Sequence, residues 1–302
     1  MDEANYSDGD INTRLVEIAD KLTVALDHLI PPANGPEAGL MRAMRHAALA
    51  NGKRMRPFFV LEAGRLFQAD ETPLLRAASA LECVHTYSLI HDDLPCMDND
   101  DFRRGQPTVH KAFNEATAVL AGDALMTLSF SILADKKTHQ DAYIRLKLID
   151  RIAEASGAKG MIGGQMIDML GAEHVRDLNT ITRMHRLKTG ALISCALDMG
   201  AIIGGASDQE HQALAGFAND LGLAYQITDD LLDATGEADE VGKATGKDEK
   251  AGKANFVTLL GIDGARQRVR LLAAQAQQHL AIFQDRAKIL SKSVDYILAR
   301  RH

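Results

Sequence analysis

Apolar residues at helical spacing dominate this sequence and leave few alternatives to a helical fold. Leu15, Ile18, Leu22 and Leu26 recur every three or four residues, and Pro31 follows where that pattern stops. Strand-like alternation of Val, Ile and aromatic residues is scarce. Further helical stretches are expected at about 37–50, 57–69, 74–94, 112–134, 141–156, 159–170, 178–204, 208–234, 254–283 and 288–300. The sequence therefore predicts an all-α fold, a single large bundle of about ten or more helices.

The breaks between these helices are short, and no long stretch rich in Pro, Gly or Ser divides the chain. Residues 1–302 are therefore expected to form one domain. Residues 1–10 are acidic and polar, without the basic start or apolar run of a signal peptide, and are expected to be disordered. Residues 236–252 combine glycines, acids and lysines with no sustained apolar period, which predicts a mobile, charged loop between two helices.

The overall charge and the cysteines narrow the class of protein. A net charge of −7 argues against a nucleic-acid partner, which usually needs a basic face. Cys83, Cys96 and Cys195 are widely spaced and form no CxxC pair, so the sequence suggests neither a disulfide framework nor a zinc cluster, and a reducing cytoplasm fits best. The most apolar stretch, 191–206, is interrupted by Asp198 and is expected to be a buried helix rather than a membrane span.

Two aspartate clusters carry the chemistry, and each ends a long apolar helix. The clusters contain Asp92, Asp93 and Asp98, and Asp229, Asp230 and Asp233. One acidic run alone would most simply be a solvated helix end, but two runs in otherwise buried segments favour a shared purpose. On a helix, Asp229 and Asp233 lie within about 40° of one another. Crowded carboxylates repel, and Mg²⁺ resolves this by taking one or two of them together with water and phosphate oxygens; Mn²⁺ is the alternative ion.

The first cluster needs a break in its helix. On a straight helix Asp92 and Asp98 would lie about 120° apart, and Pro95 does not fit an undistorted helix interior. We therefore expect the helix to break near Pro95, so that the next loop brings Asp98 back beside Asp92. A calcium loop is excluded, because the positions that need Gly and Glu in an EF-hand are Arg103 and Val109.

Basic residues are placed to hold the anion that bound metal ions would attract. Lys53, Arg54 and Arg56 form a turn before a helix, and Arg103 and Arg104 follow the first acidic run. Further cations are Lys188 within an apolar helix, and Lys243, Lys247, Lys250 and Lys253 in and beside the charged loop. Taken alone, each of these basic groups would most simply belong to a solvated surface. Together with the acidic pairs they predict a cavity that holds two diphosphates.

An ordered series of motifs resembles the trans-isoprenyl diphosphate synthases of bacterial type from about residue 35 onward. The motifs are GKRMRP (52–57), HTYSLIHDDLPCMDNDDFRRGQPT (85–108), AGDAL (121–125), GGQMIDM (163–169), KTGALI (188–193), YQITDDLLD (225–233) and VGKATGKD (241–248). The resemblance implies a helical bundle around a deep central cavity, with the two aspartate motifs facing each other across its mouth. It also implies a soluble homodimer that contains Mg²⁺.

Carried over position by position, the resemblance assigns roles to individual residues. Asp92 and Asp98 would bind two Mg²⁺ ions and Asp229 a third, with Asp93, Asp230 and Asp233 as further metal-site residues of the same motifs. The diphosphate of isopentenyl diphosphate would be held by Gly52, Lys53, Arg56, His85 and Arg104. The allylic diphosphate or its reacting end would be held by Arg103, Lys188, Thr189, Gln226 and Lys243, with Lys253 a weaker candidate.

The reaction implied is the condensation of isopentenyl diphosphate with dimethylallyl or geranyl diphosphate by ionisation, condensation and elimination. Lys188, Thr189 and Gln226 would be catalytic: Lys188 opposes charge on the leaving diphosphate, and the oxygens of Thr189 and Gln226, or nearby backbone carbonyls, stabilise the allylic cation. The released diphosphate would take the final proton. His91, although beside Asp92, is expected to be a packing or capping residue.

Product length is expected to depend on the helix before Asp92. Tyr87, five residues earlier, would form a floor, while the small Ser88 leaves room, and this pairing favours the fifteen-carbon farnesyl diphosphate. Geranylgeranyl and geranyl diphosphate stay as alternatives, as does an ordinary buried tyrosine whose hydroxyl finds a partner. A terpene cyclase is disfavoured, because it needs only one diphosphate and this sequence has a second basic site. A non-catalytic subunit is also disfavoured, because it would have lost key Asp or Lys residues that are present here. The sequence does not indicate the preferred allylic substrate.

Overall fold

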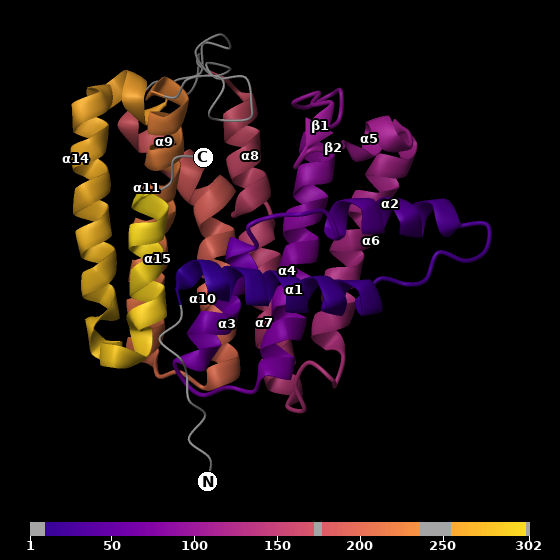
Figure 1. The fold of residues 1–302 in the computed structure, drawn as a ribbon, viewed down its shortest axis with the longest axis horizontal. Coiled ribbons are helices and arrows are strands. Elements are labelled where there is room, and N and C mark those ends of the chain that lie inside the picture. The colour runs from indigo at the N-terminus through magenta and orange to yellow at the C-terminus, as the bar shows by residue number, and fades with distance from the viewer. Residues whose placement is uncertain (1–9, 172–176, 236–254, 300–302) are drawn as a thin grey trace.

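The computed structural model describes residues 10–171, 177–235 and 255–299, which fold almost entirely into helices (Figure 1). In the first half the helices are α1 (Ile11–Leu29), α2 (Ala38–Ala48), α3 (Met55–Arg65), α4 (Glu71–Asp92), α5 (Val109–Ala112), α6 (Glu115–Ala134) and α7 (Ala142–Ser156). The second half contains α8 (Met161–Met169), α9 (Leu178–His185), α10 (Ala191–Gly204), α11 (Asp208–Thr235), α14 (Phe256–His279) and α15 (Lys288–Leu298). The all-α prediction is confirmed.

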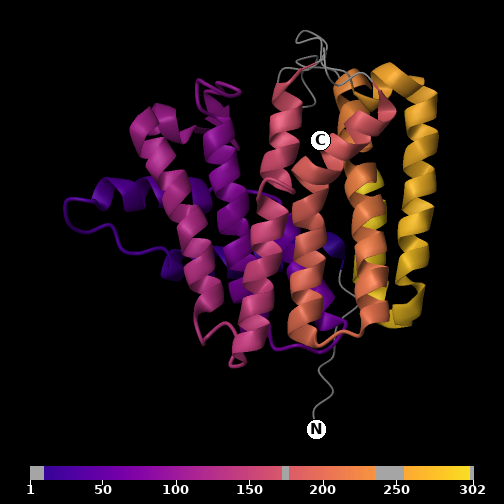
Figure 2. The ribbon, with the colours of Figure 1, turned by 180° about the vertical axis from the view of Figure 1, so that it is seen from behind.

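The long helices form a layered bundle. From behind, α6, α7, α10, α11 and α14 follow one another side by side, and each contacts the next (Figure 2). α3 and α4 pack against α10, and α1 and α2 run across the front of the bundle (Figure 1). α4 and α10 bury residues on every side, with many Ala, Ser and Gly residues that let the helix axes approach closely. α4 and α11 both run toward the end of the bundle where α9 and the loop after α4 lie (Figure 1).

Apolar burial falls into two clusters. The larger contains buried residues of α1 through α8, α10, α11, α14 and α15, and includes Phe58, Phe59 and Phe217. The smaller lies between α9, α11 and α14, around Ile181, Ile227 and Phe256. Polar caps fix where several helices begin: the side chains of Asn114, Asp141, Asp177 and Asn255 accept backbone N–H bonds in the first turns of α6, α7, α9 and α14.

Five local features differ from the sequence expectation. A short hairpin of β1 (Phe102–Arg103) and β2 (Gln106–Pro107) and the one-turn α5 lie where no element was expected. The helix expected over 178–204 contains a π-helical turn, Arg186–Gly190. α14 bends at Gly261, and a 3-10 segment, Leu280–Ala287, precedes α15. The predictions for residues 1–9 and for the loop 236–252 lie outside the described residues.

Two stretches in the described part of the chain are long and apolar enough to cross a membrane by length and composition alone, Glu115–Ala134 and Leu178–Gly204. Core helices of water-soluble proteins pass the same test, so this is weak evidence for a membrane span. Both stretches contribute side chains to the main core, among them Leu125 and Leu133 from the first and Leu192 and Leu197 from the second.

Candidate active site

The first acidic cluster folds back on itself as the sequence predicted. α4 ends at Asp92, and the loop that contains Pro95 returns so that the Asp98 N–H donates to the Asp92 carbonyl at 2.8 Å. Burial raises the pKa of the Asp92 carboxyl to about 6, an effect that Lys188 opposes and Asp98 reinforces. Burial therefore makes the Asp92 carboxyl costly to ionise, and the neighbouring charge of Asp98 adds to that cost.

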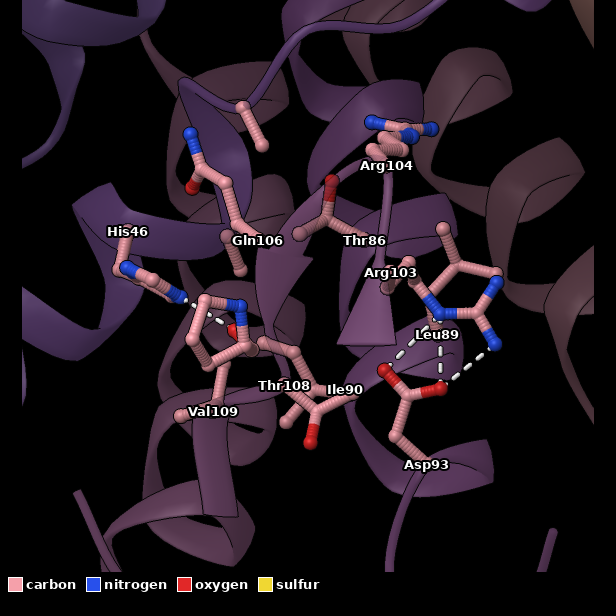
Figure 3. Close-up of a pocket in the computed structure, with 13 residues that line it drawn as sticks. His46, Thr86, Leu89, Ile90, Asp93, Arg103, Arg104, Gln106, Thr108 and Val109 are labelled. Atoms are coloured by element: carbon pink, nitrogen blue, oxygen red, sulfur yellow. Dashed lines mark hydrogen bonds and ion pairs between the residues drawn. The ribbon is translucent and has the colours of Figure 1, made fainter. Parts of the chain in front are cut away.

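Asp93 has a different environment from Asp92. Its side chain is only 2% exposed, and both carboxylate oxygens accept from Nε of Arg103, at 2.7 and 2.9 Å (Figure 3). Arg103 lies on β1, so this ion pair fastens the hairpin to the end of α4. A metal-binding role for Asp93 and a diphosphate-binding role for Arg103 stay predictions, and in this structure the two side chains bind each other.

In the second acidic cluster, too, adjacent aspartates have different environments. Asp229 and Asp233 are partly exposed on the last turns of α11, whereas Asp230 is 8% exposed. A carboxylate oxygen of Asp230 accepts the Phe256 N–H at 2.8 Å, which ties the end of α11 to the start of α14. In each Asp-Asp pair the second residue is thus buried against protein groups.

Lys188 and its neighbour Thr189 connect the two clusters. The charge of Lys188 acts on Asp92 at the end of α4. The Thr189 hydroxyl donates to Oε1 of Gln226 at 3.1 Å, and Nε2 of Gln226 donates to Asp229 at 3.4 Å. The π-helical turn that carries Lys188 and Thr189 therefore lies between the two acidic clusters, which belong to one site.

The acidic side chains suit Mg²⁺ in charge and in donor chemistry. Among the described residues, no three His, Cys, Asp or Glu side chains gather closely enough to hold an ion by themselves. Mg²⁺ needs only one or two carboxylates when water and phosphate oxygens complete its shell. Asp92 with Asp98, and Asp229 with Asp233, supply such incomplete sets on either side of Lys188.

Asp168 is a site residue to which the sequence analysis gave no role, although it lies in the GGQMIDM motif. Its carboxylate accepts from Nζ of Lys188 at 2.6 Å. The motif glycine Gly164 makes this approach possible, because a Cβ there would lie 2.2 Å from the backbone nitrogen of Lys188. α8 and the π-helical turn therefore meet through backbone at Gly164 and through an ion pair at Asp168.

A separate group of cations surrounds His85. Nη1 of Arg56 lies 3.3 Å from Nε2 of His85. Burial, followed by the charges of Arg56, Arg104 and Arg103, lowers the pKa of His85 well below its ordinary value, so the ring is neutral. The Arg104 guanidinium lies against Gly52, where a Cβ would be 2.8 Å from its central carbon. Four of the five residues expected to hold isopentenyl diphosphate are therefore together, and the fifth, Lys53, follows Gly52 on the same turn with its side chain exposed.

Arg54, the middle residue of the basic turn, points inward. It is 4% exposed, pairs with the buried Glu82 and donates to the carbonyls of Ala48 at 2.8 Å and Ala50 at 2.6 Å. Its backbone has a φ of 47°, immediately before α3. Arg54 therefore shapes the turn that presents Gly52 and Lys53.

A pocket lies between α2, α4 and the β hairpin (Figure 3). Its wall includes Thr86, Leu89 and Ile90 of α4, with Arg103 and Arg104 contributed by the hairpin. Asp93 lines the same pocket. The pocket therefore borders both Arg104 of the basic group and the Asp93–Arg103 ion pair at the end of α4.

The residues expected to set product length lie on α4. Tyr87 is 5% exposed, and its ring meets His91 edge-on at 5.8 Å. Burial raises the pKa of Tyr87 to about 12, and its hydroxyl has no hydrogen-bond partner among the described residues. The Ser88 hydroxyl donates to the His85 carbonyl at 2.8 Å. His91 bonds the Val119 carbonyl at 3.1 Å, in line with its expected packing role.

Two of the expected substrate-binding residues, Lys243 and Lys253, lie outside the described residues. All the other expected site residues are described. Apart from Tyr87 and Ser88, they form two neighbouring groups. One contains the acidic clusters with Lys188, Thr189 and Gln226, and the other contains the arginines around His85 with Gly52 and Lys53.

Comparison with known protein families defines the class of protein. The family model for polyprenyl synthetase matches residues 37–291, and the chain belongs to this family. It is 40% identical to farnesyl diphosphate synthase of Geobacillus stearothermophilus over 92% of this chain and 94% of the relative. The corresponding enzyme of Escherichia coli is 41% identical, over 91% of this chain and 94% of that protein. Geranylgeranyl pyrophosphate synthase 4 of Arabidopsis thaliana is 38% identical, over 97% of this chain and 79% of that protein.

Solved structures give the same family. An FPP/GFPP synthase from Zymomonas mobilis has a TM-score of 0.88 and 45% identity, covering 95% of this chain and 98% of that one. A geranyltransferase from Legionella pneumophila has a TM-score of 0.85 and 31% identity, covering 96% of this chain and 97% of that one.

Proposed function

We propose that this protein is a prenyltransferase that makes farnesyl diphosphate from isopentenyl diphosphate and dimethylallyl or geranyl diphosphate. The observation that carries the proposal is the arrangement of two anion-binding groups side by side. One group consists of the two acidic clusters and the residues Lys188, Thr189 and Gln226 between them. This group suits a diphosphate that is bound through metal ions. The other is the arginine group around His85, which suits a diphosphate without metal. Close relatives named farnesyl diphosphate synthase support the same reaction.

Mg²⁺ bound by Asp92, Asp98 and Asp229 would neutralise the allylic diphosphate and the charge that develops as it leaves. Lys188, oriented by Asp168, adds a positive charge next to that group. A unit charge pair at ~4 Å contributes about 1 kcal/mol in water and ~4 kcal/mol at an effective dielectric of about 20. Several such pairs supply a large part of the roughly 10 kcal/mol that enzymes commonly remove from a barrier.

The Thr189 hydroxyl donates a hydrogen bond to Oε1 of Gln226, so the lone pairs of its own oxygen stay available to the electron-poor allylic carbon. Arg56, Arg104 and Lys53 would hold isopentenyl diphosphate with its double bond facing that carbon, which provides the orientation for attack. The released diphosphate would then accept the proton lost from the new chain. We further expect Lys243 and Lys253 to bind the allylic diphosphate.

We propose that Tyr87 forms the floor for the growing chain and so limits the product to fifteen carbons. Its buried ring and its position five residues before Asp92 support this. Tyr87→Ala is expected to yield products longer than farnesyl diphosphate, and Ser88→Phe products shortened toward geranyl diphosphate, as measured by chromatography of the dephosphorylated alcohols. Unchanged product length in both variants would contradict the assignment.

Product analysis with labelled isopentenyl diphosphate tests the reaction itself. With Mg²⁺ and either dimethylallyl or geranyl diphosphate, the expected product is labelled farnesyl diphosphate, and chelation of the metal should abolish it. Absence of elongation with both allylic substrates would contradict the proposal and favour a cyclase or a non-catalytic protein. A twenty-carbon product from the wild-type protein would instead support the geranylgeranyl alternative, the activity named for the Arabidopsis thaliana relative that is 38% identical.

We also infer that the chain forms one domain and works in the cytoplasm as a homodimer without a membrane span. A single family model that extends over residues 37–291 supports the one-domain organisation. Apolar side chains exposed on α6 and α7 support an interface with a second copy.

A further inference from the structure

His185 lies next to the catalytic turn without being one of the expected substrate-binding residues. It is the last residue of α9, directly before the π-helical turn that carries Lys188 and Thr189. Nδ1 of its ring lies 2.9 Å from Oε1 of Gln226. The side chain therefore meets the group that links the turn to the second acidic cluster.

The neighbours of Gln226 favour one orientation of its side-chain amide. Its Nε2 donates to the Asp229 carboxylate at 3.4 Å, and a reversed amide would turn its oxygen toward that negative charge. With Oε1 facing the other way, this oxygen accepts from the Thr189 hydroxyl at 3.1 Å. A carboxamide oxygen has two lone pairs, so the second is available to a donor on His185 Nδ1.

The ring of His185 is itself held in place. It stacks on Phe256, with the ring centroids 5.5 Å apart and the planes 28° apart. Phe256 is 1% exposed, and its backbone N–H is bound by Asp230. Phe256 also belongs to the apolar cluster between α9, α11 and α14. Three helices therefore fix the position of a ring whose nitrogen contacts Gln226.

The orientation of Gln226 decides what Thr189 offers to a substrate. Because the Thr189 hydroxyl donates its proton to Oε1, its oxygen presents lone pairs rather than a proton to any other neighbour. Loss of the His185 donor removes one of two hydrogen bonds that hold Oε1 in place. Thr189 then loses a fixed acceptor and is free to turn its proton toward the electron-poor carbon.

We propose that His185 is a positioning residue that donates from Nδ1 to Gln226 and thereby orients Thr189 for ionisation of the allylic substrate. This inference rests on the proposed function. His185 touches neither substrate nor metal in this assignment. It acts through Gln226, and Phe256 holds its ring.

Two substitutions separate the hydrogen bond from the packing. His185→Phe keeps a ring for Phe256 and removes the donor, whereas His185→Asn keeps a side-chain N–H near the Nδ1 position and removes the ring. We expect kcat to fall about 10- to 100-fold in His185→Phe, with KM for isopentenyl diphosphate within about twofold of wild type. His185→Asn should recover most of kcat. The opposite ranking, with the phenylalanine variant active and the asparagine variant impaired, would show a packing role only and overturn the proposal.

A matched control and a double variant test whether the effect passes through Gln226. His211 also bonds a side-chain oxygen through Nδ1, at 2.7 Å from Asp198, but lies 15 residues before Gln226, or about 22 Å along α11. His211→Phe should leave kcat within about twofold. In a Gln226→Met background, His185→Phe should cause no further loss. A second full loss on top of the Gln226 effect would overturn the proposal.

The proton position has a readout that needs no turnover. In ¹⁵N-labelled free protein, the ring signals that disappear in His185→Phe should show a protonated Nδ1. A ring protonated only on Nε2 would overturn the proposal. Elongation by the wild-type protein is measured first, because its absence would overturn the proposed function itself, whereas a loss confined to the variants concerns His185 alone.

Discussion

At the scale of single residues, identical side chains take different roles because their surroundings differ. Asp92 and Asp229 face the centre of the site, beside Lys188 and Gln226. Asp93 and Asp230, the next residue in each pair, are buried and bind Arg103 and the Phe256 N–H. The first aspartate of each pair therefore suits a metal ion, and the second holds a neighbouring segment in position.

Substitution within one pair should separate these roles. Asp93→Asn leaves the Arg103 guanidinium without its counter-charge and is expected to lower the free energy of unfolding by about 1–3 kcal/mol. Asp92→Asn removes a carboxylate that is crowded by Asp98, so it should abolish turnover without loss of stability. Urea unfolding and steady-state rates measure both effects. Equal loss of stability in the two variants would contradict the division of roles.

The neutral ring of His85 predicts a pH dependence of stability. Burial and nearby arginines lower its pKa in the folded protein, so near and below about pH 6.5 the unfolded chain binds more protons than the folded one. This stabilising contribution is complete above about pH 6.5 and is lost as the pH falls, by at most about 1.4 kcal/mol per pH unit.

Denaturant titrations between about pH 7 and pH 5 measure this contribution. The free energy of unfolding of wild type should decrease more steeply toward low pH than that of His85→Gln, which cannot take up the proton. Parallel curves for the two proteins would show that His85 does not contribute.

At the scale of helices, the sequence allowed the elements to be predicted but not their irregularities. Periodic apolar residues and caps such as Asn114 placed the helices within a few residues. The π-helical turn Arg186–Gly190 was missed because its extra residue is accommodated by contacts with α8 and α11, which local preference does not encode. The hairpin at 102–107 has strands of two residues, too short for an alternating pattern.

The same limit applies to the site. The motifs identified the acidic clusters and Lys188, since their residue types suit a diphosphate. The inward position of Arg54 and the roles of Asp168 and His185 were not predicted. α4 is buried on every side, so its sequence gives no periodic sign of which face meets Arg54, and the partners of Asp168 and His185 are distant in the sequence.

Gly164 tests how closely α8 and the π-helical turn must approach. A Cβ at this position would lie 2.2 Å from the Lys188 nitrogen, so Gly164→Ala forces one of the two segments to move. We expect a loss of activity of at least about 10-fold, because Lys188 moves away from its position beside the diphosphate, and a lower melting temperature.

Gly39→Ala is the matched control, because the nearest atom to its new Cβ would be 3.9 Å away. On α2 it should be neutral or stabilise by about 0.4–1 kcal/mol. Full activity in Gly164→Ala would mean that the Lys188 turn tolerates displacement.

At the scale of the whole molecule, the site lies where the two apolar clusters meet. The larger cluster supports α4 and α10, and the smaller one supports α9, α11 and α14. His185 and Phe256 stack at the edge of the smaller cluster, next to the turn that begins α10. The relative position of the two acidic clusters therefore depends on the packing of α10 against α11.

The surface of α6 and α7 gives the last prediction. Leu120 is 56% exposed, and Tyr143 and Leu146 are 61% and 60% exposed on the neighbouring helix. Apolar side chains on adjacent helices favour an interface with a second copy of the chain. We therefore expect a dimer in sedimentation equilibrium, and Leu120→Glu combined with Leu146→Glu should shift it to monomer, because burial of the new carboxylates in the interface is unfavourable.

A control variant distinguishes this interface from a general effect of surface charge. Leu271 on α14 is 49% exposed and lies on a different helix, so Leu271→Glu should remain dimeric. A monomeric wild-type protein would contradict the interface, and so would a dimer that withstands both substitutions on α6 and α7. Binding of the wild-type monomer to lipid vesicles, lost in the same double variant, would instead assign this apolar surface to a membrane. Because the dimer prediction depends on α6 and α7 alone, its failure would leave the arrangement of Asp92, Lys188 and Asp229 unchanged.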